Sequence, residues 1–386
     1  MTPTPPAEIT SPAQLLAALV RIPSVNPDGD PGSPHAGEAA CARYVGDFLA
    51  SQCGATVTYE EVLPGRPNVI GHLTPDPGDR RPRILFAPHT DTVSVTGMTI
   101  DPFGGEIRDG RVWGRGASDT KGTMAAMLWA FHELRDRWGE INATVSFAGF
   151  MGEETAQPGS RHFARHHRGE FDFAIVGEPT GLDVVYTHKG CVWVDLSVAG
   201  RACHGASPER GVNAITRLLP VLQAIDTELR EELARFTDPV LGPATVNIGL
   251  IHGGSRTNIV PDHCAASLDF RETPALSAAG GAVGRLGALL HRHGWAETVA
   301  VKATVDTRPL DTDLQHPCVQ KLLSLGARPV GAPWFCDAAW LSDLGGIPSV
   351  ACGPGSIDQA HTEDEWLAIA DLEAGADFYR RFLESL

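Results

Sequence analysis

The sequence lacks the features that mark membrane-spanning, secreted and nucleic-acid-binding proteins. No apolar run reaches the roughly 18 residues that a transmembrane helix requires. The N-terminal segment has no cationic residue before Arg21, so we expect no signal peptide. Basic residues are the minority, with 31 Lys and Arg against 47 Asp and Glu and a formal net charge of −16. Nucleic acids and anionic membranes both require clustered positive charge, so we expect neither as a partner.

Paired cysteines are also missing. The eight cysteines are scattered along the chain, and none of them forms a CxxC pair. This spacing excludes the usual zinc knuckles and dithiol redox motifs. Unpaired thiols are typical of a reducing compartment, so the sequence predicts a cytoplasmic protein.

Several common catalytic motifs are absent as well. The segment "FHELRD" has Asp136 where the second histidine of HExxH would stand. No serine occurs in a GxSxG context. The segment "GRGASDTKG" (114–122) matches neither GxxxxGK[ST] nor GxGxxG. These absences give a serine nucleophile or a phosphate-binding loop little support.

The chain of 386 residues is long enough for two domains. Strands alternate with helices in its first part, which predicts an α/β fold with a mostly parallel central sheet. Asp109-Gly110 between two short strands is the strongest hairpin signal, and Ser11 with Pro12 predicts a helix start. The other expected elements are helices over 38–54 and 119–139 and strands over 81–89 and 143–151.

The pattern changes near residue 183. Residues 183–202 alternate as an antiparallel strand pair would. A helix over 211–236, strands over 244–254 and 263–273, a helix near 277–294 and a strand over 297–307 are expected to follow. Helix and strand patterns of the first type then resume. We therefore predict a catalytic metal-binding domain over 1–185 and 303–386, with an inserted α+β domain over 186–302.

Acidic and imidazole side chains follow the predicted strands of the first domain. In an open α/β sheet, ligands bind beyond the carboxyl ends of the strands. Imidazole and carboxylate groups together suit zinc and similar divalent metals. The candidates occur in "APHTDTV", "GRGASDTKG", "MGEET", "GEPT" and "QAHTEDEW", and they are His89, Asp91, Asp119, Glu153, Glu154, Glu178 and His361.

Their number and charge indicate a pair of metal ions. Three carboxylates and two imidazoles are too many for one tetrahedral ion and suit two ions that share a ligand. Asp119, Glu154 and Glu178 bring three negative charges, which two dications and a bridging hydroxide neutralise. Glu153 is then free to hold the water that the metals acidify. Each motif alone is weak, and the prediction depends on the set.

Taken in order, these motifs resemble a family of di-zinc metallohydrolases. It contains acetylornithine deacetylase, succinyl-diaminopimelate desuccinylase, aminoacylase and glutamate carboxypeptidase, and the resemblance covers almost the whole chain. It implies two Zn²⁺ ions, with Co²⁺ or Mn²⁺ as possible substitutes. One ion would be held by His89, Asp119 and Glu178, and the other by Asp119, Glu154 and His361.

The resemblance also implies roles around the metals. Glu153 would be the general base and acid, and Asp91 would hydrogen-bond the second ring nitrogen of His89. The peptide bond after Asp119 is expected to be cis. Gly355 would offer its backbone N–H to the substrate.

The insert resembles the family's lid and dimerisation domain, so a homodimer is expected. His204 in "RACHGASPERG" would stabilise the oxyanion in the partner's site, although a strand-end histidine in a polar loop is its ordinary interpretation. Asn258 and Arg271 would bind the substrate carboxylate, and Arg271 has a structural ion pair as its alternative. His188 and Lys189 are expected to be packing residues.

The expected activity is metal-dependent hydrolysis of the amide bond of a small N-acyl amino acid or dipeptide. A metal-bound hydroxide would attack the carbonyl, with Glu153 moving the protons. The resemblance is greatest to acetylornithine deacetylase. Succinyl-diaminopimelate desuccinylase, aminoacylase, dipeptidase and carboxypeptidase remain alternatives, as does a non-catalytic ligand-binding relative. No segment of the sequence identifies a pocket for the substrate side chain.

Overall fold

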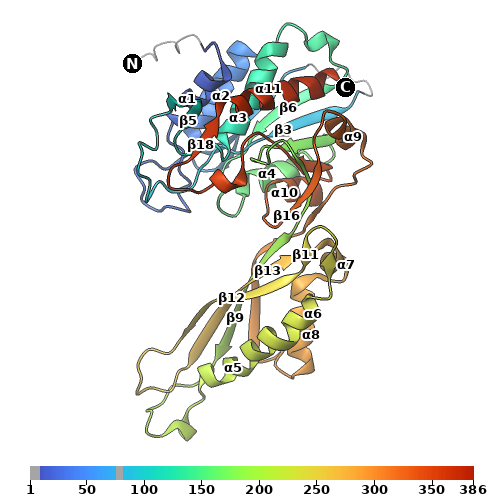
Figure 1. The fold of residues 1–386 in the computed structure, drawn as a ribbon. Coiled ribbons are helices and arrows are strands. Elements are labelled where there is room, and N and C mark those ends of the chain that lie inside the picture. Colours follow the sequence, from blue (N-terminus) through green and yellow to red (C-terminus); the bar gives the residue numbers. More distant parts are fainter. Residues whose placement is uncertain (1–8, 75–80) are drawn as a thin grey trace. The chain divides into compact units, whose positions relative to one another are not determined.

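The computed structural model describes residues 9–74 and 81–386 and divides into two compact units (Figure 1). The first unit contains the chain up to residue 186 together with 312–330 and 336–386. The second unit contains 187–311 and the short segment 331–335. The chain returns to the first unit after residue 311, later than the expected residue 302. The reason is that the strand over 299–307 pairs along its length with strand 190–199 of the second unit.

The first unit is built on a mixed sheet whose central strands are parallel. Its order begins β1-β2-β6-β3-β7-β17, and β3, β6, β7 and β17 pair in parallel. The bounds are β1 (Thr56–Leu63), β2 (Arg66–His72), β3 (Arg83–Ala87), β6 (Thr144–Gly149), β7 (Phe173–Val176) and β17 (Ser349–Ala351). Strands β8 (Val184–His188), β15 (Leu310–Asp311) and β16 (Pro329–Ala332) complete the sheet where the chain passes between the units. The expected α/β class with a mostly parallel centre is confirmed.

Helices pack on both faces of this sheet, with α3 and α11 on one side and α4 and α10 on the other (Figure 1). They are α1 (Pro12–Val20), α2 (Ala39–Gln52), α3 (Lys121–Leu134), α4 (Pro158–His166), α9 (Pro317–Ser324), α10 (Ala338–Asp343) and α11 (Ile369–Glu384). Ser11 caps α1 by accepting a hydrogen bond from the backbone N–H of Gln14, as predicted. Phe86 of β3 meets Phe131 and Tyr379 edge to face, with centroid distances of 5.1 and 5.6 Å. These rings anchor α3 and α11 to the sheet.

A small separate sheet connects distant parts of the first unit. The predicted hairpin is present, with Asp109 and Gly110 at φ +51° and +70° between β4 (Glu106–Arg108) and β5 (Arg111–Trp113). A third strand, β18 (Trp366–Ala368), pairs antiparallel with β5. This pairing brings the segment before residue 366 beside the segment after residue 113.

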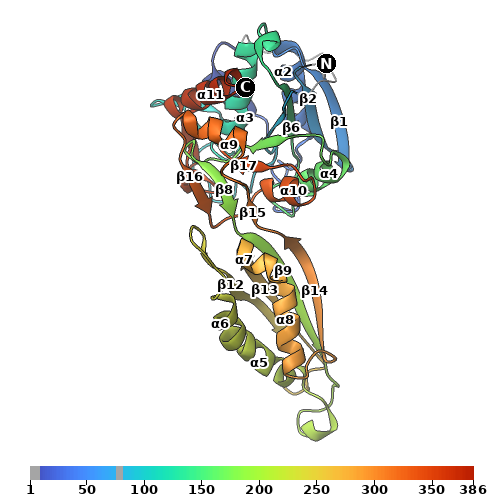
Figure 2. The same ribbon diagram turned by 90° about the vertical axis from the view of Figure 1, so that its right-hand side faces the viewer.

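The second unit is a four-stranded antiparallel sheet with one face covered by helices (Figure 2). Its order is β12-β13-β9-β14, with β9 (Gly190–Ala199), β12 (Thr245–Gly253), β13 (His263–Glu272) and β14 (Val299–Thr307). The helices are α5 (Ala214–Ala224), α6 (Arg230–Leu233), α7 (Pro274–Ala278) and α8 (Gly281–Arg292). Two short strands, β10 (Thr237–Asp238) and β11 (Gly242–Pro243), pair with each other in antiparallel fashion. Residues alternate between buried and less buried along β13, as one-sided covering requires.

Two expectations about the second unit need correction. Residues 183–202 do not form an antiparallel pair, because β8 and β9 belong to different sheets. Only Lys189 separates them, which is too short a connection for a hairpin. The expected helix over 211–236 begins at Ala214 and contains a π-helical segment, Ile225–Leu229. None of the helices in the described part of the chain combines the length and apolar character needed to cross a membrane.

Candidate metal centre

The sheet topology explains why residues distant in the sequence meet. His89 lies just after β3, Glu154 after β6 and Glu178 after β7, and these three strands are parallel neighbours. Their carboxyl ends therefore share one edge of the sheet. Asp119 lies just before α3, and His361 lies in the loop before β18. All five candidate ligands belong to the first unit.

Asp119 lies between the two histidines. Its Oδ1 is 3.0 Å from Nε2 of His89, and its Oδ2 is 3.2 Å from Nε2 of His361. The same nitrogen of His361 is 3.0 Å from Oε2 of Glu154. One ligand atom each from His89, Asp119 and Glu154 lie within 4.8 Å of one another. Asp119 therefore presents one oxygen to each side, as a carboxylate shared by two cations would.

Unpartnered oxygen atoms show that this cluster fits cations. Among the described residues, Oε1 of Glu154 and Oε1 of Glu178 are buried without a hydrogen-bond partner. An unsatisfied buried polar atom costs about 1–3 kcal/mol. A divalent ion with imidazole and carboxylate ligands would satisfy both oxygens.

The surroundings raise the pKa values of three groups in the cluster. Burial and the nearby Asp119 raise the pKa of Glu154 to about 7. Burial, followed by the charge of Asp119, raises the pKa of Glu178 well above its usual range. Hydrogen bonds to Asp119 and Glu154 raise the pKa of His361 to about 10. Each of these groups thus retains its proton to a higher pH than usual, and metals and protons compete for such groups.

Asp91 organises the turn that carries the adjacent acids. Its Oδ1 accepts the backbone N–H of Glu153 at 3.0 Å, and its Oδ2 accepts that of Glu154 at 3.1 Å. Asn26 donates to the same Oδ2 at 2.7 Å. The expected contact with Nδ1 of His89 differs in detail. The backbone carbonyl of Asp91 is the nearer acceptor at 3.0 Å, and its carboxylate is 3.4 Å away.

Glu365 fixes the loop of Asp119, and sequence reasoning missed it. This buried carboxylate pairs with Arg115 at 2.7 Å. It accepts the backbone N–H groups of Gly116 at 3.0 Å, Ser118 at 2.7 Å and Asp119 at 2.8 Å. Only its closeness to His361 in "QAHTEDEW" could have drawn attention to it. The Asp119–Thr120 peptide bond is cis, as expected.

Glu153 lies in the same cluster and takes no part in these contacts between Asp119 and the histidines. Burial, followed by the charge of Glu178, raises the pKa of Glu153 well above its usual range. Its Oε1 accepts a hydrogen bond from Nε2 of Gln157 at 2.5 Å. A carboxyl group whose pKa is raised in this way suits proton transfer.

Gly355 also belongs to the first unit. Its carbonyl accepts the backbone N–H of Gly181 at 2.7 Å, and its φ is +88°. An added Cβ would lie 2.8 Å from Cδ1 of Leu367 and 3.0 Å from Oγ of Ser118. Both the backbone conformation and the space therefore require glycine at this position.

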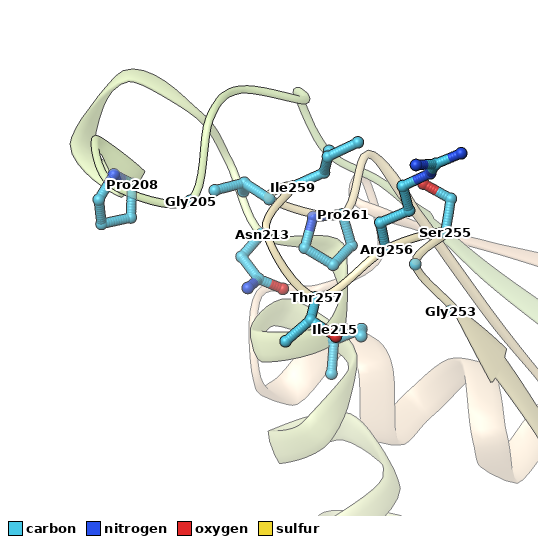
Figure 3. A pocket seen from close by; sticks show the side chains of 12 residues that line it. Gly205, Pro208, Asn213, Ile215, Gly253, Ser255, Arg256, Thr257, Ile259 and Pro261 are labelled. Carbon is cyan, nitrogen blue, oxygen red and sulfur yellow. The ribbon is translucent and has the colours of Figure 1, made fainter.

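The remaining candidates lie in the second unit. His204 and Asn258 are exposed on adjoining loops, where the N–H of Gly205 donates to the carbonyl of Asn258 at 2.8 Å. These loops border a surface cavity of about 600 Å³ (Figure 3), lined by Asn213, Ser255, Arg256 and Pro261 among others. Nδ1 of His204 accepts the N–H of Ala206 at 3.1 Å, so the neutral ring carries its proton on Nε2.

Arg271 forms an ion pair within the second unit, which is the structural role given above as the alternative to substrate binding. Its Nε is 3.1 Å from Oδ1 of Asp269, and both side chains are about one-third exposed, at 33% and 31%. The guanidinium N–H groups beyond Nε are available to another carboxylate.

Comparison with known proteins shows which family shares this sequence and fold. Residues 85–385 match the model of "Peptidase family M20/M25/M40". Acetylornithine deacetylase of Vibrio vulnificus is 31% identical over 370 residues, covering 94% of each chain. The M20 family metallo-carboxypeptidase Sso-CP2 of Sulfolobus solfataricus shares the fold, with a TM-score of 0.75, 20% identity and coverage of 97% of this chain and 99% of that one. The YXEP protein of Bacillus subtilis, a dinuclear metal-binding M20 peptidase, has a TM-score of 0.69 at 14% identity, with 97% of each chain covered.

The fold and the cluster of acids and imidazoles define a metal-dependent hydrolase of amide bonds. The chain belongs to peptidase family M20/M25/M40.

Proposed function

We propose that this protein removes the acyl group from an N-acyl amino acid in the manner of an acetylornithine deacetylase. The observation that carries this proposal is the position of Asp119 between His89 and His361, with Glu153 outside these contacts. The likeness to the acetylornithine deacetylase of Vibrio vulnificus over 94% of the chain supports the substrate class.

We assign the metal ligands from the contacts of Asp119 and Glu154 with the two histidines, and Glu178 from the family resemblance. His89, Asp119 and Glu178 would hold one Zn²⁺, and Asp119, Glu154 and His361 would hold the second. The unpartnered oxygens of Glu154 and Glu178 support this assignment. When bound, such cations polarise the amide carbonyl and lower the pKa of a water molecule.

Glu153 moves the protons of the reaction. Its carboxylate accepts a proton from the attacking water and returns that proton to the nitrogen of the leaving amine. Its raised pKa supports both steps, because a group that titrates closer to neutral pH can accept and release a proton under the same conditions. Asp91 holds the backbone N–H of Glu153 and so fixes the start of its side chain.

Residues of the second unit bind charges of the substrate. We assign the oxyanion in the partner subunit's site to Nε2–H of His204, and the substrate carboxylate to Asn258 and Arg271, while Gly355 of the first unit donates its backbone N–H. The tautomer of His204 supports its role as a donor. The protein would act as a homodimer, which light scattering of the purified protein tests. The eight free cysteines support a cytoplasmic location.

Glu153→Gln tests the proposed reaction. The metal-loaded variant should lose activity by about 10²–10⁴-fold, because general acid–base catalysis contributes about that factor. Its metal content should equal that of the parent. Glu140→Gln is the matched control, since Glu140 is an exposed acid of the first unit that pairs with Arg137.

The substrate panel should contain acetylornithine, other acetyl-amino acids, succinyl-diaminopimelate and dipeptides. Highest turnover on acetylornithine would support the assignment, and highest turnover on another compound would replace it. Full activity of Glu153→Gln would remove the proposed base. Two bound metals with no hydrolysis of any compound would instead support a non-catalytic binding protein.

A further inference from the structure

Two buried side chains outside the metal ligand set form a hydrogen-bonded chain that ends at Glu153. Gln157 immediately precedes α4 and is 2% exposed, and Trp340 lies in α10 and is 5% exposed. Nε1 of Trp340 donates to Oε1 of Gln157 at 2.8 Å. Nε2 of Gln157 then donates to Oε1 of Glu153 at 2.5 Å. The first of these contacts is fully buried.

This chain of hydrogen bonds has only one possible direction. An indole N–H can donate and cannot accept. The carbonyl oxygen of Gln157 must therefore face Trp340, and its NH₂ group must face Glu153. A glutamine without such a partner could turn its amide over and present the carbonyl instead. Trp340 thus ensures that Oε1 of Glu153 meets a donor. None of the described residues donates to the other oxygen, which remains available for proton transfer.

The surrounding structure holds this pair in place. The N–H of Gln157 donates to the carbonyl of Gly152 at 3.0 Å. Helices α4 and α10 lie side by side in Figures 1 and 2, and Oγ of Ser160 donates to Oδ1 of Asp337 at 2.5 Å between them. The guanidinium of Arg161 lies 4.7 Å from the ring centre of Trp340. Gln157 and Trp340 therefore have little freedom to move away from Glu153.

We propose that Gln157 and Trp340 are positioning residues that hold the carboxylate of Glu153 in the orientation needed for proton transfer. This inference rests on the proposed role of Glu153. Among the described residues, neither of the two forms a hydrogen bond with a side chain that we assign to the metals. Breaking the chain of hydrogen bonds should therefore slow the chemical step and leave metal content and substrate affinity unchanged.

The test uses Gln157→Leu and Trp340→Phe in the metal-loaded enzyme. We expect kcat to fall about 10- to 100-fold in Gln157→Leu, since a misplaced catalytic group costs up to about that factor. The fall in Trp340→Phe should be smaller, because the amide keeps its place and loses only its fixed direction. KM and metal content should match the parent in both. Trp129→Phe is the control, because it removes an indole N–H that donates to Glu133 at an exposed position.

A second measurement is independent of activity. The indole N–H signal of Trp340 in a ¹⁵N spectrum is identified by its absence in Trp340→Phe. In Gln157→Leu the same signal should move upfield, because its acceptor is gone. The double variant should be no slower than Gln157→Leu alone, since one break already disconnects Trp340 from Glu153.

The outcomes separate this inference from the proposed function. Parental kcat in folded Gln157→Leu, together with an inactive Glu153→Gln, would overturn the positioning role and leave the base in place. Full activity in Glu153→Gln would overturn the base itself. Loss of metal or a matching rise in KM would show a structural role instead and would also overturn the inference. If Gln157→Leu does not fold, Trp340→Phe decides the question by kcat alone.

Discussion

The two units place most of their candidate functional residues in different surroundings, with His361 of the first unit, whose side chain is 55% exposed, as an exception. In the first unit, His89, Asp119 and Glu178 are between 2% and 7% exposed. In the second unit, His204 and Asn258 are exposed on loops. In the first unit, Asp91 and Glu365 accept the backbone N–H groups of Glu153 and Asp119, and Asn26 donates to Asp91. The ring of His204, by contrast, accepts a single backbone N–H group.

This difference separates two ways of building a functional site. Burying charges is costly, so the first unit needs the network of hydrogen bonds and cations that compensates for it. The same network holds the reacting groups in place before any substrate arrives. Exposed residues carry no such cost, and their contribution arises only when a ligand or partner meets them. Substitutions in the two units should therefore differ in what they disturb.

The largest effect is expected at the centre of the buried cluster. Asp119→Asn removes the charge that faces both histidines, so the purified protein should retain little metal and lose more than about 10³-fold of its activity. Metal analysis and turnover measure the two effects together. The exposed Asp136, whose side chain is 84% accessible, provides the control Asp136→Asn. A metal-replete Asp119→Asn would contradict the assigned shared ligand.

A smaller effect, and a different one, is expected in the second unit. His204→Ala should bind metal as the parent does, while kcat falls about 10²–10³-fold, the usual result of removing one oxyanion donor. His252→Ala removes another exposed histidine of the same unit and should change nothing. A kcat equal to that of the parent in His204→Ala would show that His204 is a histidine of a polar loop with no part in catalysis.

The smallest effect concerns a buried histidine of the second unit and appears only in stability. Burial lowers the pKa of His188 from 6.5 to about 4, and its Nε2 has no hydrogen-bond partner among the described residues. Between these pH values the unfolded chain binds a proton that the folded protein excludes. The free energy of unfolding should therefore fall as the pH falls through this range, by roughly 3 kcal/mol.

Urea unfolding of the parent and of His188→Gln measures this contribution. The variant should lose less stability than the parent between pH 7 and pH 4.5, because it has no such group to titrate. His252→Gln should behave as the parent does. If the free energy of unfolding changed equally with pH in all three proteins, His188 would be accessible to protons in the folded state.

Local signals in the sequence predicted most elements of the first unit. Ser11 marked the start of α1, and Asp109-Gly110 marked the hairpin, because caps and tight turns depend on neighbouring residues alone. Sheet membership depends on distant pairing, which the alternation of residues 183–202 does not specify. The prediction therefore joined β8 and β9, which the fold places in two sheets.

The same limit applies to the site. The types and order of His89, Asp119, Glu154 and His361 are enough to indicate metal chemistry from the sequence alone. The residues that hold these side chains in place could not be predicted from the sequence in this way. Gln157 and Glu365 act through hydrogen bonds to residues nearby in space, and a glutamine or glutamate in a loop has no sequence pattern that reveals such a partner.

The contact between Glu365 and the backbone of Asp119 joins residues 246 positions apart. A ribosome adding roughly 5–20 residues per second needs on the order of 10–50 seconds to make that stretch. Throughout that interval the loop of Asp119 exists without the carboxylate that orients it, and His361 has not yet been made. Of the two proposed metal sites, the one that includes His361 is therefore complete only after synthesis has passed that residue, and chains cut short before residue 361 would lack it.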